Sequence, residues 1–217
     1  VPFYFILHYE SLWTRHKTRA VKTYDLPMKK LVLSNWLKDT LKKNHGQNAD
    51  VFVTPVDQDM FFCSKKKWNS TRRVCMLHHD YGWKGYEDGI KAVKAVIAQG
   101  HDLELVVFGE KLKDPQPLFD AAGFEFEYHY RPAREKLRKI YVSCDIFLCS
   151  SWHEGLGLTG MEAMACRCSL VTTNTGGCLE YAIDGKTALV SGPRDIIGLS
   201  QNLIRLLEDE ALLKLLS

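Results

Sequence analysis

The sequence lacks a long apolar run, an excess of one charge and any repeated motif. Its longest apolar run near the start, Phe3 to Leu7, is far shorter than the roughly 20 residues needed to span a bilayer. Lys and Arg number 29 against 26 Asp and Glu, which gives a net charge of +3. This near balance excludes a broad surface for nucleic acid or anionic membrane. We therefore expect no nucleic-acid partner, and any anion must be bound locally.

The seven cysteines lack a repeated CxxC spacing, and most of them lie in apolar stretches. That distribution is typical of free thiols buried in a protein of a reducing compartment, so we predict a cytoplasmic location. Cys166 and Cys168 have the spacing of half a metal site, but no second Cys or His pair stands at ligand spacing nearby. We expect no metal site.

The chain of 217 residues is about one and a half times a usual domain. With 46% hydrophobic and 25% charged residues, it has the composition of an ordinary globular protein. It begins at Val1 without Met and ends at Ser217 within a helical pattern. We expect it to be a piece of a longer protein.

From residue 73 onward, short apolar runs alternate with segments of helical period. The expected strands are Arg73–His78, Leu103–Phe108, Phe124–Tyr128, Asp145–Cys149, Cys168–Thr172 and Thr187–Val190. Because these runs are nearly continuous, we expect strands buried on both faces, joined by right-handed crossovers into a doubly wound, Rossmann-like α/β domain. Ligands of such a sheet bind beyond the carboxyl ends of its strands. One apolar helix is expected over Leu203–Leu216.

The first 62 residues repeat this alternation on a small scale. Strands are expected at Val1–Leu7 and Lys30–Leu33, followed by a helix over Asn35–Lys43 that Ser34 caps. These strands are too few to close a core of their own. We therefore divide the chain into a fragment, 1–62, and a complete domain, 63–217, and read Ser64–Thr71 as a solvated connector.

The densest run of glycine and acid follows the strand that ends at Cys149. Its sequence is SSWHEGLGLTGMEAMAC, in which Gly155 and Gly157 delay the next helix until about Leu158. The first amides of that helix would be unpaired at the positive end of its dipole, where anions bind. Glu154 and Glu162 would grip two ends of an elongated ligand. A polyhydroxylated ligand carrying phosphate fits this layout, although two acids at a helix start are also favoured by the dipole alone.

The block HEGLGLTGMEAMAC resembles the E-x7-E signature of retaining glycosyltransferases of the GT-B fold, family 4 type. Four further blocks resemble the same family in the same order: KGYEDGIKAV, LVVFGE, LRKIYVSCDIFLCSS and TGGCLEYAIDGKTALV. The opening HYESLW and KLVLSNWL resemble the end of the family's amino-terminal domain. The resemblance implies that 63–217 is the carboxyl-terminal domain, which binds a nucleotide-diphosphate sugar. It also implies that 1–62 is the remnant of an acceptor-binding domain.

The resemblance also implies roles for individual residues. The residues expected to act in catalysis are Glu154, Lys84 and His79. The residues expected to bind the donor are Gly155, Leu156, Gly157, Leu158, Glu162, Arg131 and His153. By this likeness Glu162 would hold the ribose and Lys84 the phosphates, with no cofactor beyond the donor itself. His79 stands where the family usually has Arg, and a neutral imidazole lacks the fixed charge and fork of a guanidinium.

The implied reaction transfers a sugar, with retention, to a saccharide or lipid-linked acceptor in polysaccharide or glycoconjugate synthesis. The missing amino-terminal half would hold that acceptor and make any peripheral membrane contact, so we expect the present piece to be inactive alone. Two alternatives stay open: a non-catalytic sugar-nucleotide sensor or subunit, and a GT-B nucleotide-sugar hydrolase or epimerase. His8 has no partner at ligand spacing and is read as a surface or satisfied residue, and Glu180 is read as a cap of its own helix.

Overall fold

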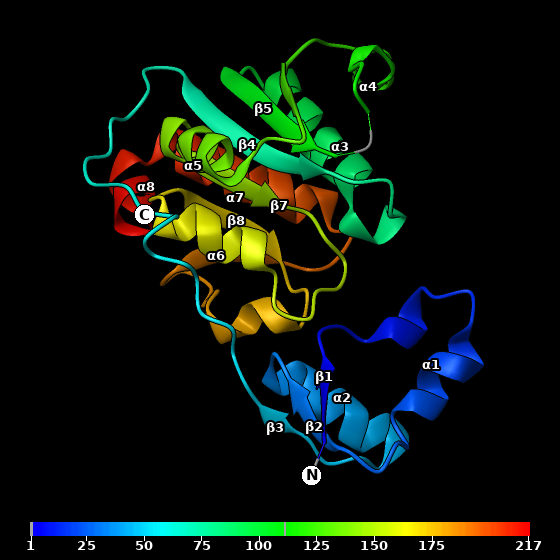
Figure 1. The fold of residues 1–217 in the computed structure, drawn as a ribbon. Helices are drawn as coiled ribbons and strands as arrows, with labels where there is room; N and C mark the ends of the chain where they lie inside the picture. Colours follow the sequence, from blue (N-terminus) through cyan, green and yellow to red (C-terminus); the bar gives the residue numbers. More distant parts are fainter. Residues whose placement is uncertain (1, 111) are drawn as a thin grey trace.

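We examined a computed structural model of the chain, which describes residues 2–110 and 112–217. It contains two parallel sheets, each with its own helices, joined by a long connector along one side (Figure 1). The expected strand Val1–Leu7 is found as Phe3–Ile6, and Val1 lies outside the described residues. No helix in the described part of the chain is both long and apolar enough to cross a membrane.

The larger sheet has six parallel strands in the order β6-β5-β4-β7-β8-β9. Its strands are β4 (Arg72–His78), β5 (Leu103–Gly109), β6 (Glu127–Tyr130), β7 (Ile146–Cys149), β8 (Ser169–Thr173) and β9 (Ala188–Ser191). Numbered along the chain, this is the order 3-2-1-4-5-6, the doubly wound arrangement of the Rossmann fold. The predicted fold class is confirmed, and the strand order reverses direction between β4 and β7.

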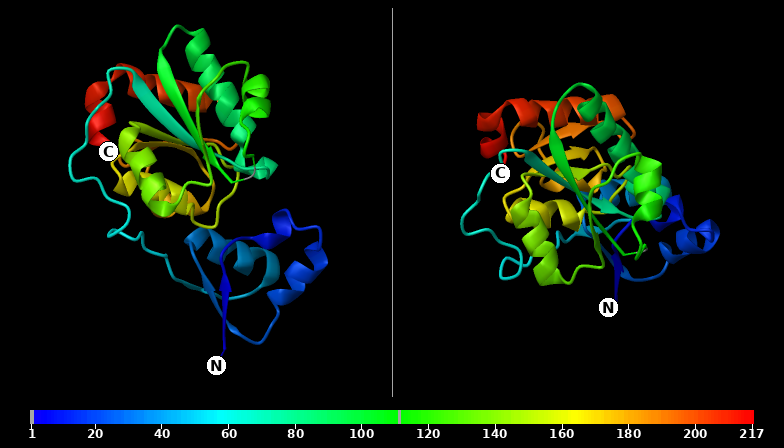
Figure 2. Two further views of the ribbon diagram at one scale, coloured as in Figure 1. Left: turned by 45° about the horizontal axis from the view of Figure 1, so that its top comes forward. Right: turned by 90° about the horizontal axis from the view of Figure 1, so that it is seen from above.

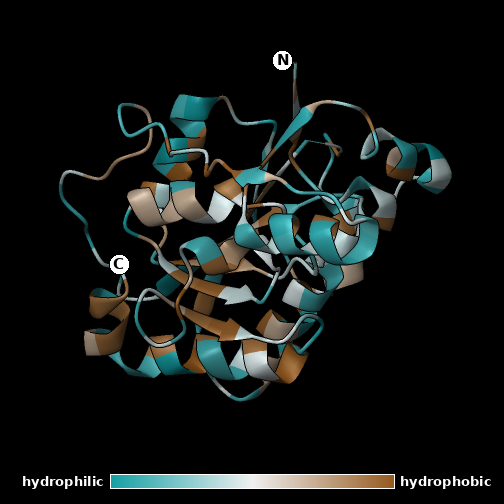
Figure 3. Ribbon diagram, turned by 90° about the horizontal axis from the view of Figure 1, so that it is seen from below, coloured by the Kyte–Doolittle hydropathy of each residue, from teal (hydrophilic) through white to brown (hydrophobic). Residues whose placement is uncertain are grey.

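Helices cover both faces of this sheet because alternate strand residues face opposite sides. Val74 and Met76 of β4 join one core cluster, whereas Cys75 joins the other. The first face is covered by α3 (Tyr86–Ala98) and α7 (Ile196–Glu208), and the second by α5 (Arg134–Ser143) and α6 (Leu158–Ala165). The strands between them are predominantly hydrophobic (Figure 3). The remaining helices of this part are α4 (Gln116–Ala122), α8 (Glu210–Leu215) and the 3-10 turns η2 (Gly82–Lys84) and η3 (Gly177–Glu180).

The smaller sheet orders its three parallel strands β1-β2-β3. Its elements are β1 (Phe3–Ile6), η1 (Glu10–Leu12), α1 (Lys17–Thr23), β2 (Lys29–Val32), α2 (Asn35–His45) and β3 (Asp50–Val51). As expected, Ser34 caps α2 by accepting a hydrogen bond from the Leu37 amide. This sheet does not close its core alone: Leu156, only 2% exposed, comes from the larger part and completes it. The two parts meet near the carboxyl edge of the large sheet (Figure 2).

Two expected elements of the large part have other bounds in the structure. The strand expected at Phe124–Tyr128 begins at Glu127, because Phe124 and Phe126 pack edge to face against each other before pairing with β5 starts. The helix expected over Leu203–Leu216 is two helices, because Asp209 has an extended backbone and caps α8 through the Leu212 amide.

The connector is only partly solvated. Lys66 donates hydrogen bonds to the carbonyls of Val142 and Cys144 at the end of α5, and the Asn69 side chain donates to Asp145. The expectation for the thiols is confirmed: all seven cysteines are free, and each is buried or half-buried.

Candidate active site

The loops that follow β4 and β7 meet at the carboxyl edge of the sheet, on either side of the point where the strand order reverses. A crevice at this point is where open α/β sheets bind ligands. Three contacts join the two loops: the Ser150 hydroxyl donates to the Gly85 carbonyl at 2.7 Å, the Ser151 hydroxyl donates to Lys84 O, and the Trp152 amide donates to Trp83 O. The loops therefore form one unit.

Lys84 owes its position to the residue after it. Gly85 has φ +64°, and a Cβ added there would lie 1.9 Å from the carbonyl oxygen of Ser150. Only glycine combines this backbone conformation with this close approach. Gly85 thus ends η2, begins α3 and lets the chain pass directly over the β7 loop.

Glu154 is held in the second loop by backbone pairing. Its amide donates to the Thr175 carbonyl, and its own carbonyl accepts from the Gly177 amide. Its buried carboxylate forms an ion pair with Lys84, whose ammonium lies 2.8 Å from Oε1 and 3.0 Å from Oε2. The two predicted catalytic residues, 70 positions apart in sequence, are therefore in direct contact at the switch point of the sheet.

A third member of this cluster is His8, which belongs to the small sheet. Its Nε2 lies 4.0 Å from Oε2 of Glu154, and its Nδ1 accepts a hydrogen bond from the Tyr9 amide. Burial, with a contribution from the Lys84 charge, lowers the pKa of His8 to about 3, so the imidazole is neutral and carries its proton on Nε2. The reading of His8 as a surface or satisfied residue is wrong: Nε2 is buried and has no hydrogen-bond partner within the described chain.

The glycine-rich turn leads from this cluster into α6, which begins at Leu158 as predicted. Gly157, with φ +87°, occupies the N-cap position, and no side chain in the described chain caps the helix. The Tyr181 hydroxyl donates a hydrogen bond to the Gly157 carbonyl at 2.7 Å and so stabilises the turn. The Leu156 side chain is buried in the small-sheet core, so this residue can offer a ligand only its backbone.

Glu162 has partners different from those of Glu154. The Tyr141 hydroxyl lies 3.5 Å from its carboxylate, and the positive charge of Arg134 also acts on it. Burial raises the pKa of Glu162 to about 7, although Arg134 and Tyr141 both act to lower it. A carboxylate this poorly solvated gains strongly from hydroxyl donors of a ligand.

The other predicted site residues lie around this centre. His153 stacks on Trp36 of the small sheet, with ring centroids 6.3 Å apart, and burial and Arg194 lower its pKa. Arg131 is exposed and has φ +43°, and its amide donates to the Gly109 carbonyl beyond β6. Nδ1 of His79 accepts from the Tyr81 amide at 3.2 Å.

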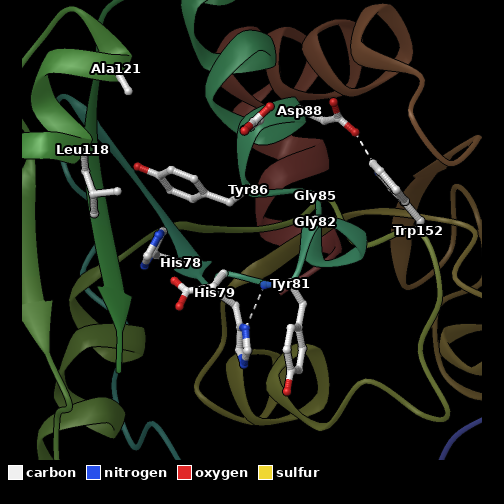
Figure 4. A pocket seen from close by; sticks show the side chains of 12 residues that line it. His78, His79, Tyr81, Gly82, Gly85, Tyr86, Asp88, Leu118, Ala121 and Trp152 are labelled. Atoms are coloured by element: carbon white, nitrogen blue, oxygen red, sulfur yellow. Dashed lines mark hydrogen bonds between the residues drawn. The ribbon is translucent and has the colours of Figure 1, made fainter. Parts of the chain in front are cut away.

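A pocket of about 300 Å³ opens beside the β4 loop (Figure 4). Its lining residues are His78, His79, Asp80, Tyr81, Gly82, Gly85, Tyr86, Glu87, Asp88, Leu118, Ala121 and Trp152. Figure 4 shows Tyr86 pointing toward Leu118 of α4, whereas His79 and Tyr81 point away from α3. Nδ1 of His78 and the Tyr86 hydroxyl are buried without a partner in the described residues, so both remain available to a ligand.

Glu180 is not the cap of its own helix. Its carboxylate accepts from the Asn35 amide at 2.5 Å and from the Asn35 side chain at 3.1 Å. Glu180 therefore binds the amino end of α2 in the small sheet, where an acid is stabilised by the helix dipole. Sequence reasoning missed this contact and that of His8, because both join segments more than 140 residues apart.

Residues 57–217 match the family model of the group 1 glycosyl transferases. The chain belongs to this family. The predicted membership is thus confirmed over most of its length, and the matched range contains both Lys84 and the E-x7-E acids. Among the described residues, no three His, Cys, Asp or Glu side chains are grouped as metal ligands.

The glycosyltransferase chain is similar to curated proteins over parts of its length. It is 37% identical over 87 residues to the N,N'-diacetylbacillosaminyl-diphospho-undecaprenol alpha-1,3-N-acetylgalactosaminyltransferase of Campylobacter jejuni, covering 39% of this chain and 22% of that protein. It is 39% identical over 76 residues to the glycogen synthase of Mycobacterium tuberculosis, covering 35% and 18%. The chain therefore matches less than a quarter of the length of these relatives.

Solved structures share its fold at low sequence identity. Anabaena HepE, crystallised with UDP-glucose, aligns with a TM-score of 0.82 and 18% identity over 99% of this chain and 65% of HepE. Staphylococcus aureus TarM aligns with a TM-score of 0.81 and 16% identity over 99% of this chain and 45% of TarM. The small sheet is included in both alignments, so the arrangement of both sheets is that of the GT-B fold.

Proposed function

We propose that residues 63–217 bind a nucleotide-diphosphate sugar and that the whole protein transfers this sugar, with retention, to a saccharide or lipid-linked acceptor. The observation that carries the proposal is the Lys84–Glu154 pair at the switch point, beside the uncapped start of α6. An ammonium and a helix amino end are complementary to a diphosphate. The donor class is supported by the related structures of Anabaena HepE, which are complexes with UDP and with UDP-glucose.

In this proposal the donor diphosphate lies between Lys84 and the amides of Gly155 to Leu158, and its ribose hydroxyls donate to Glu162. The sugar lies against Glu154 and the neutral Nε2–H of His8. Arg131 and the loop around it face the base, and His153 borders the sugar. His79 is assigned to the phosphate side of the β4 loop, where it lines the pocket described above.

The transfer breaks the bond between the sugar's anomeric carbon and the diphosphate oxygen. A new bond forms between that carbon and an acceptor hydroxyl, whose proton passes to the departing phosphate. Lys84 and the helix amides stabilise the negative charge that develops on the leaving group. A helix end supplies about 0.3 to 2 kcal/mol, whereas enzymes lower barriers by about 8 kcal/mol or more. Closure against the acceptor-binding half must supply much of the difference.

We also propose that 1–62 is the trailing part of that acceptor-binding domain. Three large apolar side chains on and just after β1 are each at least half exposed, those of Phe3, Phe5 and Leu7. Such an exposed apolar face is expected where the rest of the acceptor-binding domain would pack against the small sheet. Accordingly, residues 1–217 alone should bind donor but transfer sugar slowly or not at all. Robust transfer by this chain alone would contradict the assignment of 1–62.

Calorimetry with UDP, GDP and their hexose conjugates tests the donor site. We expect one nucleotide series to bind, and Lys84→Ala and Glu162→Ala each to weaken binding by about tenfold or more, since each removes a charge-assisted contact. Lys91→Ala and Glu125→Ala remove the same charges from exposed positions and should bind as the wild type does. If no nucleotide binds, or if the site variants match these controls, the donor site is placed wrongly.

A further inference from the structure

A second polar pocket lies at the opposite edge of the large sheet. Its volume is about 460 Å³, within the range of about 300 to 1,000 Å³ typical of small-molecule sites. Its lining residues are Lys65, Lys67, Asn69, Arg73, Arg138, Lys139, Val142 and Ser143. Five of these eight residues carry a positive charge, and none carries a negative charge.

Four of the five cations have no acidic partner among the residues that the structure describes. Arg73 is neutralised by Glu127 and Glu104 on the neighbouring strands. By contrast, no described carboxylate lies within ion-pair distance of the remaining four side chains, which are those of Lys65, Lys67, Arg138 and Lys139. Uncompensated charges of one sign repel one another in a shared hollow, and a bound anion would relieve that repulsion.

The pocket is built from segments that are fixed to the fold. Lys66 bonds to the carbonyls that end α5, so the connector is anchored beside that helix between Lys65 and Lys67. The Arg138 guanidinium lies over the Phe62 ring, with its central carbon 4.6 Å from the ring centroid. These contacts hold the connector beside α5, so that cations from both segments line one hollow.

Its place in the fold separates this pocket from the donor site. Arg73 is the second residue of β4. Residues 138–143 form the end of α5 that leads into β7. Both positions belong to the amino edge of the parallel sheet. Lys84 and Glu154 follow the opposite, carboxyl ends of the same two strands.

We propose that this pocket binds a phosphate-bearing anion at a site distinct from the donor site. Three lysine side chains and the Arg138 guanidinium line it without an acidic partner among the described residues, and this set matches the negative charge and the acceptor oxygens of phosphate groups. The phosphate belongs either to a soluble di- or polyphosphate or to the headgroup of an anionic lipid.

Titration of the ¹⁵N-labelled chain with inorganic pyrophosphate, followed by NMR, tests the pocket at its own residues. We expect saturable shifts of the Asn69 and Ser143 amides. A variant carrying Lys65→Gln, Lys67→Gln, Arg138→Gln and Lys139→Gln should weaken this binding about tenfold or more, because four charge-assisted contacts are lost. A variant with Gln at Lys17, Lys22, Lys38 and Lys43 removes the same net charge elsewhere and should retain wild-type affinity. If the fourfold change unfolds the chain, the double variant Lys65→Gln/Lys67→Gln, which changes only the connector, replaces it in the binding measurement.

Sedimentation with vesicles identifies the source of the phosphate. Binding to vesicles of phosphatidylglycerol and phosphatidylcholine, but not of phosphatidylcholine alone, supports a lipid headgroup if the pocket variant abolishes it and the control variant does not. Pyrophosphate shifts without such vesicle binding support a soluble phosphate. If neither probe binds at the pocket, or if the pocket and control variants behave alike with both probes, the proposal is overturned.

Discussion

Lys84 and Glu154 neutralise each other in the absence of ligand, so the proposed donor site holds a buried pair rather than an open positive charge. A diphosphate that takes the Lys84 ammonium must leave the Glu154 carboxylate with new donors. In the proposed complex these donors would be sugar hydroxyls, and Nε2 of His8 lies 4.0 Å from the same carboxylate. A nucleoside diphosphate without its sugar therefore leaves Glu154 less well satisfied than the complete donor does.

Glu162 should make stability depend on pH. Burial raises its pKa from 4.5 to about 7, so between these values the folded chain holds a proton that the unfolded chain releases. The free energy of unfolding should therefore fall as pH rises through this range, and Glu162→Gln should remove that part of the slope. Urea unfolding at about pH 5 and about pH 8 measures it. Glu125→Gln, at an exposed position, is the control, and equal pH dependence in Glu162→Gln and wild type would contradict the buried acid.

Gly85→Ala should destabilise the chain far more than Gly46→Ala. Both glycines have positive φ, +64° and +66°, so both substitutions carry a strain of about 1 kcal/mol or more. Only at Gly85 does the added Cβ meet backbone, the Ser150 carbonyl, whereas nothing lies within 4 Å at Gly46. Comparing the thermal unfolding of the two variants separates the backbone strain, which both share, from the steric clash of the added Cβ, which only Gly85→Ala has. Equal losses would show that the β4 and β7 loops are not packed as described.

At the scale of helices and strands, local signals predicted most elements. Ser34 and the glycines before Leu158 placed the starts of α2 and α6 correctly, because caps and backbone freedom act within a few residues. The expectation for the end of the chain was wrong for a related reason. The apolar period continues through Leu203–Leu216, but Asp209 can accept from a downstream amide and begin a new helix.

Asp209→Ala should lower stability by about 1 kcal/mol, the usual effect of losing an N-cap. The Asp209 carboxylate accepts a hydrogen bond from the Leu212 amide at 2.9 Å. Because α8 has only six residues, it has few other hydrogen bonds to stabilise it when this cap is removed. Urea unfolding compared with Asp102→Ala, an exposed acid, measures the effect. If the two variants were equally stable, the break between α7 and α8 would not depend on this cap.

At the scale of the molecule, an aromatic contact joins the two parts beside the proposed site. Trp13 of the small part stacks on Trp83 of the β4 loop, with centroids 4.5 Å apart and planes 22° apart, and His8 contacts both rings. Neither Trp gives a sequence signal for this contact, since the residues are 70 positions apart and lie in different segments. Lys84 and Glu154 were singled out by their resemblance to family motifs, whereas the contacts of His8 and Trp13, which come from tertiary packing, were not predicted.

A double-mutant cycle on Trp13→Ala and Trp83→Ala should give a coupling of about 0.5 to 1.5 kcal/mol, as for stacked aromatic pairs. Urea unfolding of the wild type, both single variants and the double variant provides the four values. The pair Trp68 and Trp83, which has no contact in the described structure, should be additive and serves as the control. Additivity of Trp13 and Trp83 would show that the two parts do not meet through these rings.

Gly155 is a point of direct backbone contact between the two parts of the chain. A Cβ at this position would lie 1.9 Å from the carbonyl oxygen of Leu7, so the turn that carries Glu154 rests directly on the end of β1. No side chain stands between them to absorb a displacement. A hinge movement that opened the cleft to release product would lift this support from the turn, and closure would restore it. In the proposed enzyme, separation of the two sheets and loss of the assembled site would then be one event.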